Sequence, residues 1–244
     1  MKTILITGAS SGIGRVTAEA FLNAGWHVGL VARRAEKLEE LADKKTNVVP
    51  LAADVTDTVA MQSVFDAFVD KTGRLDAVFN NAGMFGPSKS PDEVGFEEFD
   101  QVIDVNVRGM FITAKLAFAQ MRAQSPQGGR IINNDSLSAH NPRPGSIRYT
   151  TSKHAVTGLT RALSLDGRPF DIACGQIDIG NARTELVEDL NRRAQAANPD
   201  ATPAPMMDVQ DAARSVLHMA EMPLSTNVQF MTVLATKMPY IGRG

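Results

Sequence analysis

The sequence has little that would stabilise the protein from outside its own core or direct it out of the cytoplasm. Its 244 residues include a single cysteine, Cys174, so no disulfide can form within the chain. One thiol fits a reducing cytoplasm, where we expect the protein, and a small buried residue is the preferred interpretation over a catalytic thiol. No apolar run reaches 18 residues, and only five residues separate Lys2 from Gly8, too few for a signal peptide.

An excess of charge of one sign is also missing. Lys and Arg number 25 and Asp and Glu number 27, which gives a net charge of −2. The basic residues are scattered, and the densest cluster is Lys44-Lys45. Nucleic acid or an anionic membrane needs a basic face, so we expect neither as a partner. The histidines show no metal-ligand spacing, and we assign no metal.

Short apolar runs alternate with longer amphipathic segments. Strands are predicted over residues 2–7, 27–32, 47–53, 75–80, 130–134, 171–177 and 228–234. Helices are predicted over residues 13–24, 34–45, 58–71, 96–124, 148–165 and 209–220. Such alternation predicts an α/β fold, a Rossmann-type doubly wound parallel sheet of seven strands with helices on both faces, in one domain spanning 1–244. Residues 178–208 break the rhythm with a short predicted helix over 185–196 and several prolines, and suggest a lid over a site.

A glycine-rich turn, Thr7-Gly8-Ala9-Ser10-Ser11-Gly12-Ile13-Gly14, follows the first strand. Its glycines leave no Cβ where the turn is tight and where backbone approaches a pyrophosphate, and the next helix presents its N-terminal amides to that phosphate. An ordinary strand–helix loop is the alternative, but the position after the first strand favours a dinucleotide. The candidate cofactor-binding residues here are Gly8, Ser10, Ser11, Gly12, Ile13 and Gly14.

Arg33 and Arg34 follow the second strand, where sites that select NAD carry an acidic residue for the ribose 2′-hydroxyl. Ala32 stands there instead, and a guanidinium can pair with a 2′-phosphate. A solvated helix start is the alternative, although cations are unfavourable at that end of a helix. We therefore predict NADP(H) in preference to NAD(H).

Two further strand ends carry candidate nucleotide contacts. Asp54-Val55 follows the third strand, and the Asp54 carboxylate suits the adenine amino group unless it only caps the next helix. Asn80-Asn81-Ala82-Gly83 closes the fourth strand, where the Asn pair can bind exposed strand ends and the small residues leave room for a nucleotide. An ordinary turn remains the alternative for this second motif.

Tyr149 and Lys153 are four residues apart on a predicted helix, hence on one face, and Ser136 lies thirteen residues before the tyrosine. Singly, these residues also fit an exposed side-chain pair and a turn serine. The ordered set is more specific, and it comprises Thr7-Gly8-x3-Gly12-x-Gly14, Asn80-Asn81-Ala82-Gly83, Asn106, Ser136 and Tyr149-x3-Lys153. Over residues 3 to about 185 this set resembles the single-domain short-chain dehydrogenase/reductase family, in order and spacing.

The resemblance implies roles for four catalytic residues. Tyr149 exchanges a proton with the substrate oxygen during hydride transfer, and Lys153 supplies the charge that favours the phenolate. Lys153 also binds the nicotinamide ribose, Ser136 holds the substrate oxygen, and Asn106 anchors a water that links Lys153 to solvent. The family thus implies an NADP(H)-dependent oxidoreductase that interconverts a secondary alcohol and a carbonyl on a small-molecule substrate.

Some residues depart from the family pattern. Asp135 replaces a small residue, and we expect it in a helix–sheet contact, with recognition of a cationic substrate as the alternative. Ile179-Gly180 replaces Pro-Gly, although Gly180 and Thr184 can still serve the carboxamide and pyrophosphate, and Ile179 remains a cofactor candidate. Three basic residues precede Tyr149 and suit either an anionic substrate or the surface, namely His140, Arg143 and Arg148.

The family also implies a homodimer or homotetramer, assembled through the two long helices. Two rival functions stay open. An epimerase or dehydratase would need a larger substrate domain, for which the chain has no room. A non-catalytic NADP-binding sensor or regulator on the same fold typically lacks the tyrosine or the lysine, and both are present here.

Overall fold

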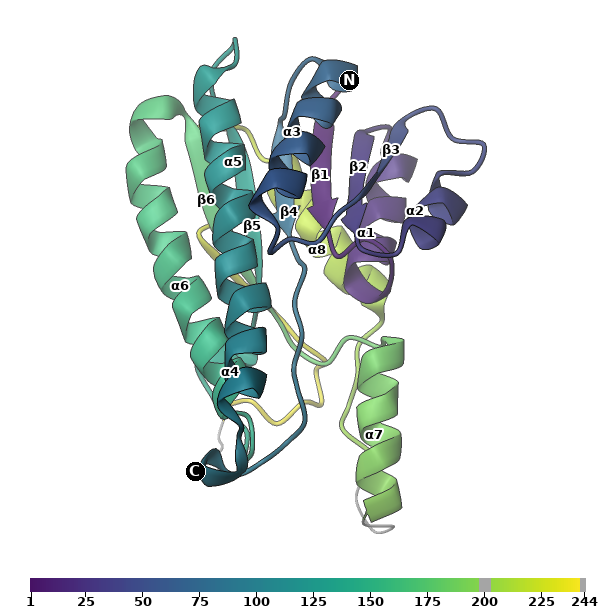
Figure 1. Cartoon of the computed structure of the whole chain (residues 1–244), viewed down its shortest axis with the longest axis vertical. Coiled ribbons are helices and arrows are strands. Elements are labelled where there is room, and N and C mark those ends of the chain that lie inside the picture. The colour runs from purple at the N-terminus through teal and green to yellow at the C-terminus, as the bar shows by residue number, and fades with distance from the viewer. Residues whose placement is uncertain (198–202, 242–244) are drawn as a thin grey trace.

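A parallel sheet of seven strands runs through the computed structural model, which describes residues 1–197 and 203–241 (Figure 1). The strands are β1 (Thr3–Thr7), β2 (His27–Ala32), β3 (Val48–Ala52), β4 (Ala77–Asn80), β5 (Gly129–Ser136), β6 (Ile172–Ile179) and β7 (Phe230–Val233). Their order in the sheet is β3-β2-β1-β4-β5-β6-β7, with every neighbouring pair parallel. The order reverses between β1 and β4, which is where open α/β sheets bind ligands.

Helices cover both faces of the sheet. They are α1 (Gly12–Asn23), α2 (Ala35–Ala42), α3 (Thr58–Thr72), α4 (Phe96–Ile103), α5 (Met110–Ala123), α6 (Ile147–Gly167), α7 (Glu185–Ala197) and α8 (Val209–Glu221). Successive residues of β1 point to opposite faces, so Ile4 packs with α1, α2 and α8, whereas Leu5 packs with α3 and α5. The predicted Rossmann-type architecture is confirmed. No described helix is long and apolar enough to cross a membrane.

Local chemistry accounts for several boundaries. Pro50 lies in β3, an edge strand, where its missing N–H costs no sheet hydrogen bond. Asp57 caps α3 by accepting hydrogen bonds from the amides of Val59 and Ala60, at 2.9 and 3.0 Å. Gly73 ends the same helix in the left-handed region, with a φ of 79°.

The structure corrects the helix predicted over 96–124. It is divided into α4, a π-helical segment η2 (Asp104–Gly109) and α5. π-turns widen a helix locally and are frequent at functional sites. Here the segment carries Asn106, one of the candidate catalytic residues.

The predicted fifth and sixth strands were each two residues too short at their carboxyl ends. β5 reaches Ser136 and β6 reaches Ile179, and these two residues are paired in register. The candidate lid therefore begins at Gly180, not at Asp178. Its helix, predicted over 185–196, is α7, whereas 198–202 lies outside the described residues.

Candidate active site

The glycine turn leaves almost no space between β1 and the start of α1. Gly8 has a φ of 69°, and a Cβ on Gly14 would lie 2.3 Å from the Gly8 carbonyl oxygen. Ser11 is the N-cap residue of α1 but makes no side-chain cap, so the first-turn amides stay open to a ligand. The turn and helix start together fit a bound pyrophosphate.

Two arginines lie at the end of β2, beside this turn. Arg34 Nη2 donates hydrogen bonds to the Oγ atoms of Ser10 and Ser11, at 2.9 and 3.0 Å. The Arg33 side chain is 78% exposed, and its Nη1 lies 3.9 Å from Asp54 Oδ2. Arg33 is therefore held only loosely and can turn toward an anionic ligand, while Arg34 lies across the turn.

Asp54 is not the helix cap that the sequence left as one alternative, because Asp57 caps α3. Its Oδ1 accepts hydrogen bonds from the amide and hydroxyl of Thr56, at 3.0 and 2.8 Å. The Thr56 amide is the main cause that holds the pKa of Asp54 below its ordinary value. Val55 is buried and packs against Gly109 of η2, so its contact with a cofactor stays a prediction.

Asn81 joins the ends of three strands. Thr7 Oγ1 accepts hydrogen bonds from the amides of Asn81 and Ala82, at 2.9 and 3.0 Å, and Asn81 Nδ2 donates to the Thr7 carbonyl at 2.9 Å. Asn134 Nδ2 donates to Asn81 Oδ1 at 2.8 Å. Thr7 and Asn134 were missing from the predicted site, although each lies at the carboxyl end of a strand, where parallel strands converge.

Asn106 connects the loop after β4 to α6. Its amide forms hydrogen bonds of 2.8 Å with both the N–H and the carbonyl of Met84, and a third of 3.0 Å to Ser152 Oγ. A Cβ on Gly83 would lie 3.3 Å from Asn106 Oδ1, so this loop passes close to the asparagine. These bonds satisfy the hydrogen-bonding groups of the buried Asn106 amide. The bond to Ser152 also fixes the residue that precedes Lys153.

The candidate catalytic side chains lie at the carboxyl end of β5 and near the start of α6. Lys153 Nζ donates to the Asn134 carbonyl at 2.8 Å and lies 5.5 Å from the centre of the Tyr149 ring. Ser136 ends β5, and its Oγ accepts a hydrogen bond from the Ser138 amide at 3.2 Å. The Lys153 side chain is only 7% exposed, so its charge acts with little screening from water.

Phe85 packs against the ring of the candidate catalytic tyrosine. The centres of the Phe85 and Tyr149 rings are 4.3 Å apart, with 33° between their planes. Phe85 was not among the residues predicted for the site. It gives the surroundings of the tyrosine an apolar wall, and its only sequence signal was its position just after Asn80-Asn81-Ala82-Gly83.

Residues 2–195 match the family model described as short chain dehydrogenase. The chain belongs to the short-chain dehydrogenase/reductase family. It is therefore an oxidoreductase of a family that acts on alcohol and carbonyl groups with a nicotinamide cofactor.

Individual relatives show a range of substrates. Sulfoacetaldehyde reductase 2 of Chromohalobacter salexigens is 31% identical over 244 residues, which cover 97% of this chain and 95% of the relative. The A-factor type gamma-butyrolactone 1'-reductase (1S-forming) of Streptomyces virginiae is 36% identical over 205 residues, covering 82% and 77%. The 3-ketoacyl-(acyl-carrier-protein) reductase from Brucella melitensis, solved with NADH, superposes with a TM-score of 0.85 at 26% identity, over 96% of both chains.

Two features that depart from the short-chain dehydrogenase pattern are built into the sheet. The expected helix–sheet position of Asp135 is confirmed, because Thr157 of α6 donates a hydrogen bond of 3.2 Å to its Oδ2. Ile179 is buried in register with Ser136, and Gly180 donates its N–H to the Val233 carbonyl at 2.8 Å. The chain thus keeps a regular strand up to the residue that replaces the family's proline.

Thr184 lies beside the glycine turn. Its methyl carbon would be 3.5 Å from a Cβ on Gly12, so the segment after β6 returns to the start of α1. The methyl group is the part of Thr184 that faces the turn, since its hydroxyl accepts a hydrogen bond of 3.4 Å from the Val187 amide. Thr184 thus lies next to the candidate pyrophosphate site, and its contact with a cofactor stays a prediction.

The three basic residues before Tyr149 are all paired. His140 Nε2 lies 3.1 Å from Asp178 Oδ2, and Arg143 Nη2 donates to Asn181 Oδ1 at 2.9 Å. Arg148 is buried, and it lies 3.3 Å from Glu98 Oε2 and donates to the Pro87 carbonyl. The surface alternative is therefore wrong for Arg148, whereas its contact with a substrate anion stays a prediction.

Residues 1–197 and 203–241 hold no group of three or more His, Cys, Asp or Glu side chains that could bind a metal ion. Cys174 is fully buried, and burial raises the pKa of its thiol to about 12. A protonated thiol in the core is a packing residue and not a nucleophile.

Proposed function

We propose that the protein is an NADP(H)-dependent oxidoreductase that interconverts a secondary alcohol and a carbonyl, with Tyr149 as the general acid or base. The observation that carries the proposal is the buried Lys153 ammonium, which lies beside the Tyr149 ring and is held by the Asn134 carbonyl. Both residues lie on the carboxyl side of the sheet, where the glycine turn also lies. The dinucleotide and the proton donor thus share one edge.

A bound nicotinamide supplies or accepts the hydride. During reduction the substrate oxygen takes a proton from Tyr149, and the Lys153 ammonium stabilises the phenolate that remains. Ser136 already accepts a hydrogen bond from the Ser138 amide, so its own hydroxyl proton is free to be donated to the substrate oxygen. Oxidation of an alcohol runs the same proton transfer in reverse.

Preference for NADP(H) is proposed from the two arginines at the end of β2. Arg34 lies across the glycine turn, and the loosely held Arg33 has the freedom to pair with a 2′-phosphate. The carboxylate that would accept from a ribose 2′-hydroxyl is absent at Ala32. We also propose the segment after β6, from Gly180 to about residue 208, as the lid of this site within a single domain.

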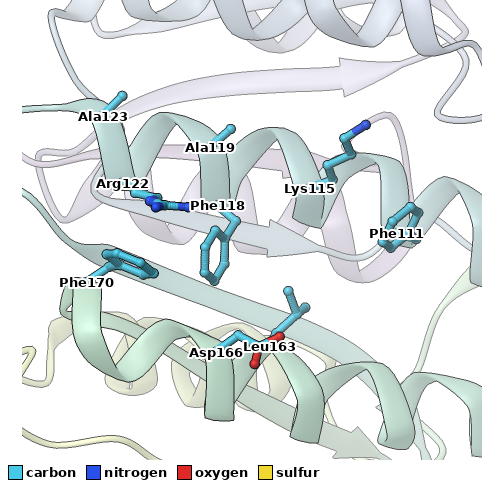
Figure 2. Close-up of a pocket in the computed structure, with 9 residues that line it drawn as sticks. All are labelled: Phe111, Lys115, Phe118, Ala119, Arg122, Ala123, Leu163, Asp166 and Phe170. Carbon is cyan, nitrogen blue, oxygen red and sulfur yellow. The ribbon is translucent and has the colours of Figure 1, made fainter.

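A second copy of the chain is the proposed partner. A hollow of about 740 Å³ opens between α5 and α6 (Figure 2). It is lined by Phe111, Lys115, Phe118, Ala119, Arg122, Ala123, Leu163, Asp166 and Phe170. None of these residues belongs to the predicted site, and Phe111 is half exposed. Apolar side chains with charges of both signs suit a self-complementary interface, as in a homodimer or homotetramer built on α5 and α6.

The test of the function is Tyr149→Phe, with Tyr240→Phe as the matched control because the chain has two tyrosines. NADPH oxidation is followed with a panel of aldehydes and ketones, and NADP⁺ reduction with secondary alcohols and hydroxy acids. Tyr149→Phe should bind NADPH normally and lose turnover by about 10²–10⁴-fold, whereas the control keeps it. Near-normal activity of Tyr149→Phe would contradict the assignment. Tight NADPH binding by the wild type without turnover of any substrate would favour a sensor.

A further inference from the structure

Two buried carboxylates lie side by side beneath α6. Asp135 of β5 and Asp178 of β6 are partners in the strand register, and each residue is only 2% exposed. Like charges at directly opposed positions of neighbouring strands repel one another, and burial disfavours each charge further. Such a pair needs compensating partners.

Asp178 has its own set of partners. Gln176 Nε2 donates to its Oδ1 at 2.6 Å, and His140 Nε2 lies 3.1 Å from its Oδ2. The His140 side chain is 40% exposed, so this carboxylate is connected through a titratable ring to the solvent. Asp178 is therefore bound on both oxygens, and Lys153 is not among its ion-pair partners in the described part of the chain.

Asp135 is bound on one oxygen only. Thr157 donates to its Oδ2, whereas its buried Oδ1 has no hydrogen-bond partner among the described residues. The cation nearest to that open oxygen is Lys153 Nζ, at 3.9 Å. In the part of the chain that the structure describes, Asp135 is also the one carboxylate within 4 Å of this ammonium.

The charge of Asp135 therefore acts on the same ammonium that acts on Tyr149. An ionised Asp135 cancels part of the positive potential that Lys153 produces at the phenol, and a protonated Asp135 leaves that potential whole. The titratable groups around Asp135 are Lys153 on α6 and Asp178 on β6, with His140 beyond Asp178. Neither the sequence prediction nor the family pattern gives Asp135 a role in the reaction.

We propose that Asp135 is a positioning residue, which holds the Lys153 ammonium and, by gaining or losing its own proton, sets how strongly that ammonium stabilises the Tyr149 phenolate. The idea rests on the proposed function, in which Tyr149 transfers the proton. Burial, opposed by Lys153 and reinforced by Asp178, raises the pKa of Asp135 to about 7. Its charge thus changes near neutral pH.

The chain allows a direct test because Tyr240→Phe leaves Tyr149 as its single tyrosine. Phenolate absorbance, recorded against pH with and without saturating NADP⁺, then reports the ionisation of Tyr149 alone. Asp135→Asn in this background removes the negative charge and keeps a group that can bond to Thr157. The midpoint should fall by about one pH unit, since a nearby charge shifts a pKa by roughly 1–3 units.

Asp178→Asn is the matched control, because it removes an equally buried charge that forms no ion pair with Lys153 in the described part of the chain. It should lower the midpoint by clearly less than Asp135→Asn does. Asp135→Ser, which places a small neutral residue there, should reproduce the fall and serves if the asparagine variant does not fold. A midpoint that stays or rises in both Asp135 variants overturns the proposal, as does an equal fall in Asp178→Asn.

Kinetics separate this inference from the proposed function. The absorbance titration needs no substrate, so a shifted midpoint in a protein without turnover supports the link between Asp135 and Tyr149 and contradicts the oxidoreductase reaction. Turnover that depends on Tyr149, together with an unshifted midpoint, supports the oxidoreductase reaction and contradicts the link between Asp135 and Tyr149. With a substrate in hand, the alkaline loss of kcat for carbonyl reduction should begin at lower pH in Asp135→Asn, because the proton leaves the phenol earlier.

Discussion

The buried Asp135 carboxyl should make the folded chain progressively less stable as the pH rises. Its pKa is about 7 in the folded state and 3.8 in an exposed chain, so the folded protein holds this proton more tightly. The stabilisation from that proton is complete below about pH 4 and is lost as the pH rises through about 7. Asp135→Asn has no such proton, so its stability should not show this loss as the pH rises.

The size of the effect follows from the same two values. A rise in pKa from 3.8 to about 7 corresponds to about 4 kcal/mol, at ~1.4 kcal/mol for each tenfold change in proton affinity. Between pH 5 and pH 8, about 2–3 kcal/mol of it should appear in the difference between the unfolding free energies of Asp135→Asn and wild type. The free energy of unfolding of the variant should therefore rise relative to that of the wild type as the pH increases through this interval.

Urea unfolding at a series of pH values measures this difference, and the fluorescence of Trp26, the single tryptophan, reports the transition. Asp54→Asn is a control of opposite sign. The Thr56 amide lowers the pKa of Asp54, so that carboxylate stabilises the fold above about pH 4 and its contribution is lost as the pH falls. The reasoning is refuted if the difference between Asp135→Asn and wild type does not change between pH 5 and pH 8, where the difference for Asp54→Asn should stay constant, or if it falls as the pH rises.

Three further substitutions test the site and the surface. Arg33→Asp should weaken NADP(H) binding by at least tenfold more than NAD(H) binding, and equal losses in the two dissociation constants would show that Arg33 does not contact a 2′-phosphate. Gly14→Ala should lower the unfolding free energy by about 1–3 kcal/mol and weaken both cofactors, since its methyl would lie 2.3 Å from the Gly8 oxygen. Unchanged denaturation and cofactor titrations would mean that α1 can move away. Phe111→Glu should reduce the mass found by sedimentation without loss of helical circular dichroism, and an unchanged mass would exclude α5 from the interface.

The cofactor side of the site follows from the sequence because its signals are local. A glycine turn directly after β1 and the i,i+4 spacing of Tyr149 and Lys153 depend on geometry within one element or one connection. A parallel sheet brings the carboxyl ends of its strands to one edge, so motifs that are distant in sequence meet there. Thr7 and Asn134 were missed because their roles depend on hydrogen bonds between strands, which a residue-by-residue reading does not contain.

The candidate substrate side of the site was harder to predict because the ends of β5 and β6 carry polar residues, which are not typical of a buried strand. Asn133-Asn134-Asp135 has low strand propensity, so the strand was predicted to end early, and Asp178 was assigned to a lid. Both strands continue because other elements bind one atom of each of these side chains, although Asn134 Oδ1 and Asp135 Oδ1 have no hydrogen-bond partner among the described residues. Asn133, for example, donates to Thr160 of α6 at 2.9 Å. Tertiary hydrogen bonds override local propensity in this region.

Buried positions of a strand ordinarily carry small or apolar residues, and a chain that departs from this rule at a cost in stability often does so at a functional site. An ordinary sheet would place small or apolar residues at both positions of the pair, as the family does at the residue before Ser136. This chain instead buries two carboxylates, and the Oδ1 of Asp135, which has no hydrogen-bond partner among the described residues, lies 3.9 Å from Lys153 Nζ. If the buried pair had no part in the reaction, Asp135→Asn would still become more stable relative to wild type as the pH rises but would leave the titration of Tyr149 unchanged. The stability and titration experiments on this one substitution therefore decide together whether the cost is structural or functional.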